Sequence, residues 1–400
     1  MKRLLVSAVA VFSIFIANAQ TDKTDKAKEP DYQFTTIKEN PITSIKNQYR
    51  SGTCWCFSAL SFIESELLRT QKKTYDLSEM WVVSHAYHDR AVKYVRMGGH
   101  MGFSAGSGFG DVFTTISKYG IVPQDIYSGM QYGTSLPEQA ELDAVLKGYV
   151  NAVVSNPNKT LTTAWKKGFD AVLQAYMGEW PSTFNTDNGT FTPETYRDEV
   201  LGFDASQYVN ICSFCDEPLH QLVSIDVCDN WRNAPGYNVT MDEMLRIMYH
   251  ALDNGYTVLW GGDVSEKGFT RNGLGVMPKA KDDKKPAAGS DQEHWVGKDN
   301  TKAEESDTVE IPEEVEVNDS LRLDAYDRKM TTDDHGMHIY GYAKDQNGTK
   351  YFLVKNSWGE AGKYKGIWYM SETFIAYKTL NFVVSKEALP KDIRKALGIK

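Results

Sequence analysis

A cysteine stands at the start of a predicted helix, directly behind a glycine-containing turn, in the run N-Q-Y-R-S-G-T-C-W-C-F-S from Asn47 to Ser58. Apolar residues then recur at steps of three and four, at Phe57, Leu60, Ile63, Leu67 and Leu68. This period predicts one amphipathic helix from about 54 to 69. A helix N-terminus lowers the pKa of a thiol through its exposed N–H groups and its macrodipole, and the thiolate is the nucleophilic form. Cys54 is therefore a candidate nucleophile, although a cysteine buried in a core helix would give the same pattern.

The C-terminal part of the sequence changes from helical to strand-like periodicity. Short apolar runs are separated by turns such as Asn347-Gly348, a typical hairpin sequence. The runs cover 337–343, 351–355, 366–370 and 380–384. They predict an antiparallel sheet or a small barrel. Combined with the helices predicted at 54–69, 80–94 and 110–119, they favour an α+β fold.

Further residues complete the pattern that a nucleophilic cysteine requires. The run H-G-M-H-I-Y-G-Y begins at His335, and the run K-N-S-W-G-E carries Asn356. An imidazole can hold the cysteine as a thiolate and later protonate a leaving amine, while an asparagine carbonyl orients the imidazole. The side chain of Gln48 is a neutral donor that, with the Cys54 N–H, would form an oxyanion hole. Trp358 would shield the histidine–asparagine hydrogen bond from water.

These motifs resemble those of the papain superfamily of cysteine peptidases. The resemblance implies a papain-like fold with Cys54 as nucleophile, His335 as base, Asn356 as orienting residue and Gln48 as oxyanion donor. The interval between Cys54 and His335 is about twice the roughly 130–150 residues expected for plain papain-like enzymes. The bleomycin hydrolase/aminopeptidase C branch fills this interval with a large helical insertion, which we expect here at about 136–235. The stretches that look like that branch are Leu77–Glu79, Lys118–Pro123, Thr192–Tyr196 and Leu259–Val264.

Two of the motifs contain a second candidate residue. The resemblance prefers His335 because the family's catalytic histidine lies six residues before the glycine of a Gly-Tyr pair, here Gly341-Tyr342. His338 is three residues further on, so on a strand its side chain points to the opposite face. Likewise, Cys54 precedes the tryptophan of its motif and Cys56 follows it. We therefore expect Cys56 to serve in packing.

The resemblance implies hydrolysis of peptide bonds through an acyl-enzyme thioester, as an aminopeptidase on short peptides, with no metal or organic cofactor and in a homohexamer. In that branch the chain's own C-terminus lies in the cleft and meets the free amine of the substrate. We expect this chain to end, at Lys395–Lys400, without much of that branch's tail. Ser107 and Gly108 stand where the family has a glycine pair on the substrate-binding wall. A papain-like endopeptidase with an open cleft and a catalytically silent peptide-binding protein stay alternatives.

The first residues predict export. Lys2-Arg3 precede an apolar run from Leu4 to Ile16, and Ala17–Ala19 form a small-residue cleavage site. The run is shorter than the roughly 20 apolar residues of a membrane span. We therefore predict a cleaved signal peptide at 1–19 and a mature protein without a membrane span, located in the periplasm, at the cell surface or outside the cell.

We expect the remaining chain to consist of a short leader and one large domain. Residues 20–35 are polar and charged, which predicts a flexible leader. Residues 36–400 then form the predicted peptidase domain. Within it, hydrophobicity falls and acidic residues gather at about 278–330, which predicts a flexible acidic excursion.

Charge and cysteine content narrow the remaining function classes. A net charge of −9 disfavours nucleic acid as a general partner. The five cysteines are an odd number, so at least one is expected to be unpaired. Cys212, Cys215 and Cys228 lie near one another, and either a disulfide or buried thiols would explain them. No second Cys-x-x-Cys pair supports a zinc site, and no thioredoxin-like βαβ pattern supports thiol–disulfide exchange.

Overall fold

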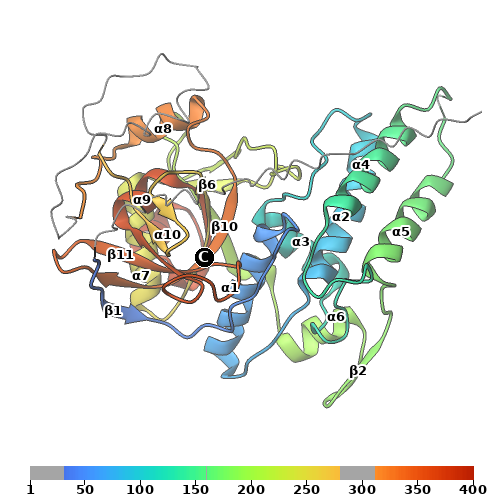
Figure 1. Cartoon of the computed structure of the whole chain (residues 1–400), viewed down its shortest axis with the longest axis horizontal. Coiled ribbons are helices and arrows are strands. Elements are labelled where there is room, and N and C mark those ends of the chain that lie inside the picture. The colour runs from blue at the N-terminus through green and yellow to red at the C-terminus, as the bar shows by residue number, and fades with distance from the viewer. Residues whose placement is uncertain (1–30, 159, 280–310) are drawn as a thin grey trace, which may run out of the picture.

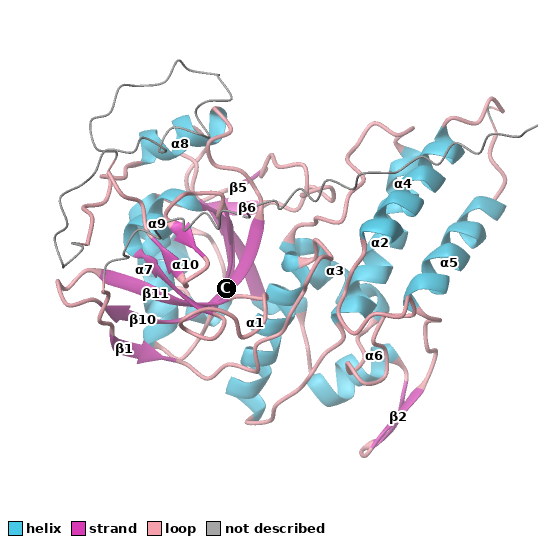
Figure 2. Ribbon diagram, viewed as in Figure 1, coloured by secondary structure: helices cyan, strands magenta, loops and turns pink. Residues whose placement is uncertain are grey.

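The computed structural model of the chain describes residues 31–158, 160–279 and 311–400 (Figure 1). The predicted signal peptide, most of the leader and the larger part of the acidic excursion lie outside these residues. The first part of the described chain is mainly helical, and the later part forms most of an 11-stranded sheet. Figure 2 shows one end built mainly of helices and the other built of most of the strands together with further helices, with α1 (Cys54–Gln71) between the two ends. This arrangement confirms the predicted α+β fold class.

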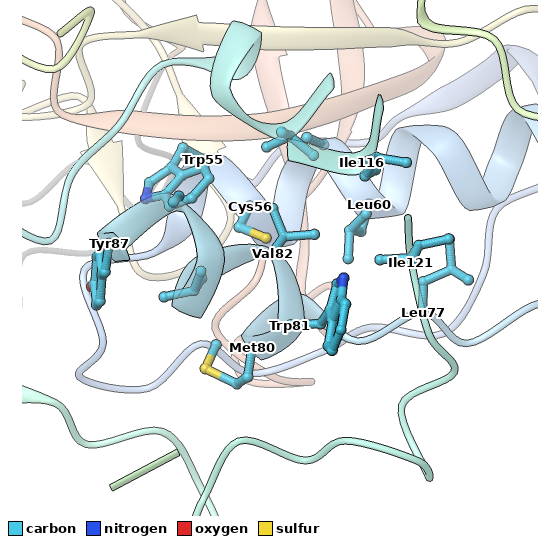
Figure 3. Close-up of a cluster of buried hydrophobic side chains, with 14 of the residues drawn as sticks. Trp55, Cys56, Leu60, Leu77, Met80, Trp81, Val82, Tyr87, Ile116 and Ile121 are labelled. Atoms are coloured by element: carbon cyan, nitrogen blue, oxygen red, sulfur yellow. The ribbon is translucent and has the colours of Figure 1, made fainter. Parts of the chain in front are cut away.

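The helical half is built around α1, whose apolar stripe faces inward as predicted. Leu60 of α1 is fully buried and meets Trp81 and Ile116, which come from the next two helices (Figure 3). The second helix begins where the sequence indicates, because the Ser78 hydroxyl oxygen accepts a hydrogen bond from the Trp81 N–H at 3.0 Å. The other helices of this half are α2 (Glu79–Arg96), α3 (Phe109–Tyr119), α4 (Ala140–Val154) and α5 (Ala164–Met177). Among the helices of the described ranges, none combines the length and continuous apolar character needed to cross a bilayer.

The sheet has the strand order β5-β6-β4-β13-β7-β10-β11-β12-β9-β8, and β1 pairs with β10 outside this path. The central strands from β4 to β12 pair antiparallel, apart from the outer parallel pairs β4–β6 and β12–β9. The four predicted apolar runs correspond to β10, β11, β12 and β13. The strands are β1 (Thr35–Glu39), β4 (Tyr208–Cys212), β5 (Leu222–Val223), β6 (Gly236–Asn238), β7 (Val258–Gly262), β8 (Phe269–Thr270), β9 (Leu274–Gly275), β10 (His335–Lys344), β11 (Lys350–Lys355), β12 (Ile367–Ser371) and β13 (Thr379–Ser385).

In the described part of the chain after β4, four α-helices accompany the sheet. Thr240 starts the first of them, because its hydroxyl oxygen accepts the Glu243 N–H and its own N–H donates to the Glu243 carboxylate. These helices are α7 (Met241–Asp253), α8 (Asp319–Asp327), α9 (Glu372–Lys378) and α10 (Lys391–Ala396).

A glycine lets the two halves approach closely. Gly336 lies at the start of β10, where α1 packs against the sheet, and a Cβ on it would lie 2.7 Å from Ser58 Oγ and 3.0 Å from the ring of Phe109. A side chain at position 336 would therefore force Ser58 and Phe109 to shift. The close approach puts the N-terminus of α1 beside the first residue of β10, and therefore Cys54 beside His335.

The segment expected to be a helical insertion, at 136–235, is helical mainly in its first part. Helices α4 and α5 lie there, but Gly178 ends α5 with φ 93°, and the chain then forms a small hairpin and irregular segments. Val209 and Ile211 alternate with less buried neighbours, a period of two that makes a strand, and this strand, β4, joins the main sheet beside β13. The elements in between are β2 (Phe184–Thr186), β3 (Gly189–Phe191), α6 (Pro193–Thr195), a π-helical turn Tyr196–Leu201 and a 3-10 turn Ala205–Gln207.

The last residues of the predicted flexible leader are packed, so this part of the prediction is wrong. Tyr32 is 6% exposed, and the Phe34 ring stacks on that of Tyr369 with 3.9 Å between centroids. The two aromatic side chains supply apolar surface that the rest of the leader lacks. The end of the acidic excursion is likewise ordered, because α8 carries Arg322 into the interior, where its guanidinium donates to four backbone carbonyl groups.

Candidate active site

Cys54 is the first residue of α1 and its side chain is partly exposed. The turn before it is held in place by Gly52, which has φ 66°, and by the Ser51 hydroxyl, which donates to the Gln48 carbonyl oxygen at 2.8 Å. A helix leaves its first N–H groups without intrahelical acceptors. The sulfur and the backbone N–H of Cys54 therefore lie in the positive field of the helix N-terminus.

His335 and Asn356 are hydrogen-bonded to each other. His335 Nε2 lies 2.9 Å from Asn356 Oδ1, and both residues are buried. They meet because β10, which begins with His335, pairs with β11, and Asn356 directly follows β11. The indole ring of Trp358 lies 4.8 Å from the His335 ring, centroid to centroid. Trp358 thus lies against the imidazole that Asn356 contacts.

Gln48 is connected to the same segment by two hydrogen bonds. Its backbone N–H donates to the Ser357 carbonyl oxygen at 2.8 Å, and its Oε1 accepts the Ser357 hydroxyl at 2.6 Å. The amide oxygen of Gln48 is used in this contact, and the two N–H groups of the same amide are not. Gln48 lines the same cavity as Cys54, so these donors are available to an oxyanion in it.

One cavity of about 290 Å³ brings the predicted residues together. Gln48, Cys54, His335 and Trp358 line it directly. The other face is the wall that includes Ser107 and Gly108. Ser107 is fixed there, since its hydroxyl donates to Asp111 and its oxygen accepts the indole N–H of Trp231 at 2.7 Å. Asn356 lies behind His335 and lines an adjoining small void.

Burial shifts the pKa values of Cys54 and His335 in opposite directions. It raises the pKa of the Cys54 thiol to about 12, although the backbone N–H of Gly336 lowers it in part. It lowers the pKa of His335 to about 4, with the hydrogen bond to Asn356 opposing the shift. Taken separately, both groups therefore favour their neutral forms. Proton transfer from the thiol to the imidazole would create two opposite charges side by side, which offsets the cost of burying each.

The second cysteine and the second histidine of the motifs lie elsewhere. Cys56 is fully buried, and its thiol donates to the Glu79 carbonyl oxygen at 3.4 Å. His338 is also fully buried, with Nδ1 at 2.9 Å from Ser61 Oγ. Neither residue lines the main cavity. Both have packing partners that explain their burial.

Among the residues at the site that the sequence motifs do not single out are Ser357, Asp333 and Asp229. Ser357 stands inside the N-S-W run, so its position next to Asn356 was a signal that could have been used. Asp333 precedes His335 by two residues and lines the cavity. Asp229 also lines it, but the residues around Asp229 carry no periodic pattern that would place them there.

The remaining cysteines form no pair. All five cysteines fall within the described residues, and each has a free thiol. Cys212 is buried in a small apolar cluster, whereas Cys215 and Cys228 are exposed. Within residues 31–158, 160–279 and 311–400, no group of His, Cys, Asp and Glu side chains is arranged to hold a metal ion.

Two family models match the chain on either side of its middle part. The papain family cysteine protease model matches residues 30–171, which include Gln48 and Cys54. The peptidase C1-like family model matches residues 301–399, which include His335 and Asn356. The two matches thus cover the segments that meet at the cavity.

Whole-length relatives lead to the same family. Aminopeptidase C of Lactobacillus helveticus is 26% identical, with 96% of this chain and 90% of the relative covered. Aminopeptidase C of Lactobacillus delbrueckii subsp. lactis is 24% identical, with 94% and 88% covered. The crystal structure of pepW from Lactobacillus rhamnosis has the same fold, with a TM-score of 0.66 and 19% identity over 91% of this chain and 84% of that one. The chain therefore belongs to the papain superfamily and is a cysteine peptidase.

Proposed function

We propose that this peptidase is an aminopeptidase of the bleomycin hydrolase/aminopeptidase C branch, acting through Cys54, His335, Asn356 and Gln48. The observation that carries the catalytic assignment is the 2.9 Å hydrogen bond between His335 and Asn356, at the cavity that Cys54 and Gln48 also line. The relatives named Aminopeptidase C support the exopeptidase assignment, because they match 94% and 96% of the chain.

The hydrogen bonds of Asn356 define the protonation of the base. Asn356 Oδ1 also accepts the Ser357 N–H at 2.7 Å, so this atom is the acceptor and the imidazole donates through Nε2–H. His335 Nδ1 then carries the lone pair, which can take the proton of the Cys54 thiol. Asn356 thereby selects the tautomer that the reaction needs, and stabilises the imidazolium that forms.

The reaction then proceeds in two halves. The Cys54 thiolate attacks the peptide carbonyl carbon, the C–S bond forms, and the carbonyl oxygen becomes an oxyanion that accepts hydrogen bonds from the Gln48 side chain and the Cys54 N–H. The His335 imidazolium gives its proton to the leaving nitrogen as the C–N bond breaks, which leaves a thioester. Water, deprotonated by the same imidazole, hydrolyses the thioester and restores the thiol.

The test compares a fluorogenic amino-acid amide with its N-acetylated form, using reduced protein and a Cys54→Ala control. Cleavage of the free-amine substrate alone, lost in the variant, is the result we expect. Equal cleavage of both substrates would mean an endopeptidase with an open cleft. The absence of any cleavage, and of labelling of Cys54 by a thiol-directed inhibitor, would favour the silent peptide-binding protein.

We also propose that the protein is exported and assembles as a homohexamer. Export rests on the signal-like residues 1–19, and the assembly on the resemblance to the bleomycin hydrolase branch. Sequencing the N-terminus of protein recovered from the cell envelope and the medium tests the first point, and a mature chain that starts after Ala19 is expected. Light scattering of the purified protein tests the second, and a monomer would contradict it.

A further inference from the structure

The charged side chains that line the catalytic cavity are all acidic. Asp229, Asp333 and Asp334 line it, and no Lys or Arg of the described residues does so. Asp333 and Asp334 directly precede His335 in the chain. Asp229 belongs to the segment 225–234, which connects β5 to β6. The cavity of this peptidase is therefore electronegative on one side of the catalytic pair.

The segment 225–234 lies against the wall on which a substrate would extend. A Cβ on Gly106 would lie 1.9 Å from Asp229 Oδ2, and one on Gly110 would lie 2.7 Å from Ala234 Cβ. A Cβ on Gly108 would lie 3.8 Å from the backbone of Asn230. The Asp229 carboxylate therefore packs directly against this wall at Gly106.

The three carboxylates differ in the hydrogen-bond and ion-pair partners that the protein gives them. Asp334 accepts the Val264 N–H at 2.9 Å and the Ser265 hydroxyl at 2.8 Å. Asp229 has only the Ser104 hydroxyl at 3.4 Å and, at 3.9 Å, the guanidinium of Arg90. Asp333 has no hydrogen bond or ion pair to any other described residue, and its partly exposed side chain lines the cavity.

The unsatisfied carboxylate lies in an environment that favours a cation. Burial raises the pKa of Asp333 to about 7, and the charges of Asp229 and Asp334 raise it in the same direction. A cation held between Asp229 and Asp333 would relieve this repulsion and favour the ionised form of both. An ammonium group offers three N–H donors, which suits two carboxylates that each have free oxygen lone pairs.

We propose that Asp229 and Asp333 bind the α-ammonium group of the peptide substrate and so select for peptides with a free amino end. This inference rests on the proposed aminopeptidase function and adds to it the residues that recognise the amine. Residues 391–400 do not line the cavity, and the Lys400 carbonyl oxygen accepts a hydrogen bond from Arg394 at 2.7 Å.

The test measures kcat/KM for an alanine amide and its N-acetylated form with wild-type protein and with Asp229→Asn and Asp333→Asn. The matched control is Asp226→Asn, since Asp226 is an exposed acid of the same segment outside the cavity, held by the Ser224 hydroxyl. Each of the two cavity variants should lower the preference for the free amine about 10- to 100-fold, the usual effect of losing a hydrogen bond to a charged group. The control should keep the wild-type preference.

Labelling of Cys54 by iodoacetamide, a neutral reagent, shows that the cavity is accessible, and a near-UV circular dichroism spectrum that matches the wild type shows that the labelled variant is folded. Where an Asn variant is not labelled, the Ser variant at the same position takes its place. Unchanged preference in labelled variants of both positions overturns the proposal, as does an equal loss on both substrates. Strong cleavage of N-acetyl-lysine amide that falls in the variants also overturns it, because the acids would then bind a basic side chain. If the wild-type protein cleaves the free-amine and the N-acetylated substrate with nearly equal kcat/KM, the proposed aminopeptidase function is itself wrong.

Discussion

The hydroxyl of Ser357 donates to Gln48 Oε1 across 2.6 Å, and the Gln48 N–H donates back to the Ser357 carbonyl oxygen across 2.8 Å. This reciprocal pair joins the turn that precedes Cys54 to the segment that carries Asn356. Both residues are at most 7% exposed, so water does not readily replace either bond. The orientation of the Gln48 side chain, the proposed oxyanion donor, is therefore set by Ser357.

Replacing Ser357 by Ala should lower kcat and leave KM nearly unchanged, because the Gln48 amide loses the hydrogen bond that orients it toward the developing oxyanion. We expect a smaller loss than the roughly 10²- to 10³-fold fall that follows removal of an oxyanion donor, which Gln48→Ala should show. Steady-state kinetics of both single variants and the double variant check this. If Ser357→Ala lowers kcat as much in the Gln48→Ala background as in the wild type, the two residues act independently and the idea is wrong.

Replacing Asn356 by Ala should lower kcat/KM by up to about 10²-fold, since the imidazole loses the partner that holds its ring and tautomer, and small misplacements of a catalytic group are this costly. The pH dependence of kcat/KM should shift as well, because the hydrogen bond to Asn356 raises the pKa of His335. Tyr342→Phe is a suitable control: Tyr342 lies on β10, the strand that begins with His335, and its hydroxyl donates to Asp253 at the surface. An unchanged pH profile in Asn356→Ala would contradict the assigned role.

The sequence predicts those parts of the fold that depend on local periodicity. Helix α1 and strand β10 lie within two residues of their predicted bounds, because their apolar patterns coincide with the faces they bury. Strand β4 was missed, since its partner β13 lies far along the chain and its alternating pattern is only five residues long. Pairings of this kind depend on the whole sheet.

The residues of the candidate site also divide into those that a local sequence pattern reveals and those whose place depends on tertiary packing. Cys54, His335 and Asn356 stand in runs with recognisable neighbours, so each could be singled out before the structure was known. Asp229 could not, because its place in the cavity depends on how the segment 225–234 packs on Gly106 and Gly110. No local pattern encodes that contact.

Replacing Lys46 by Met should destabilise the fold by about 3–5 kcal/mol, because it leaves buried carboxylates without their cation. Lys46 Nζ lies 3.1 Å from Glu64 and 2.6 Å from Glu79, whose side chains are 0% and 3% exposed. Although burial lowers the pKa of Lys46, the charges of Glu79 and Glu64 raise it above its usual range. Denaturant unfolding measures the loss.

Two further variants make the Lys46 result specific. Lys73→Met removes an exposed lysine that lies just after α1 and should change stability by no more than about 0.5 kcal/mol. Adding Glu79→Gln to Lys46→Met should restore part of the stability, because one uncompensated charge is removed. Further destabilisation by this second substitution would contradict the assignment of the loss to stranded carboxylates.

Replacing His85 by Phe should make the protein less sensitive to acid. His85 is 5% exposed, its ring lies 4.4 Å from those of Tyr119 and Trp180, and burial lowers its pKa from 6.5 to about 4. Between these two values the unfolded chain binds a proton that the folded chain does not, so stability falls as pH decreases through 6.5, by up to about 1.4 kcal/mol per pH unit. His335 contributes in the same direction in both proteins and cancels from the comparison. Denaturant unfolding at pH 7.5 and pH 5 should therefore show a smaller loss of stability in the variant, and equal losses in the two proteins would mean that His85 does not stay neutral in the folded state.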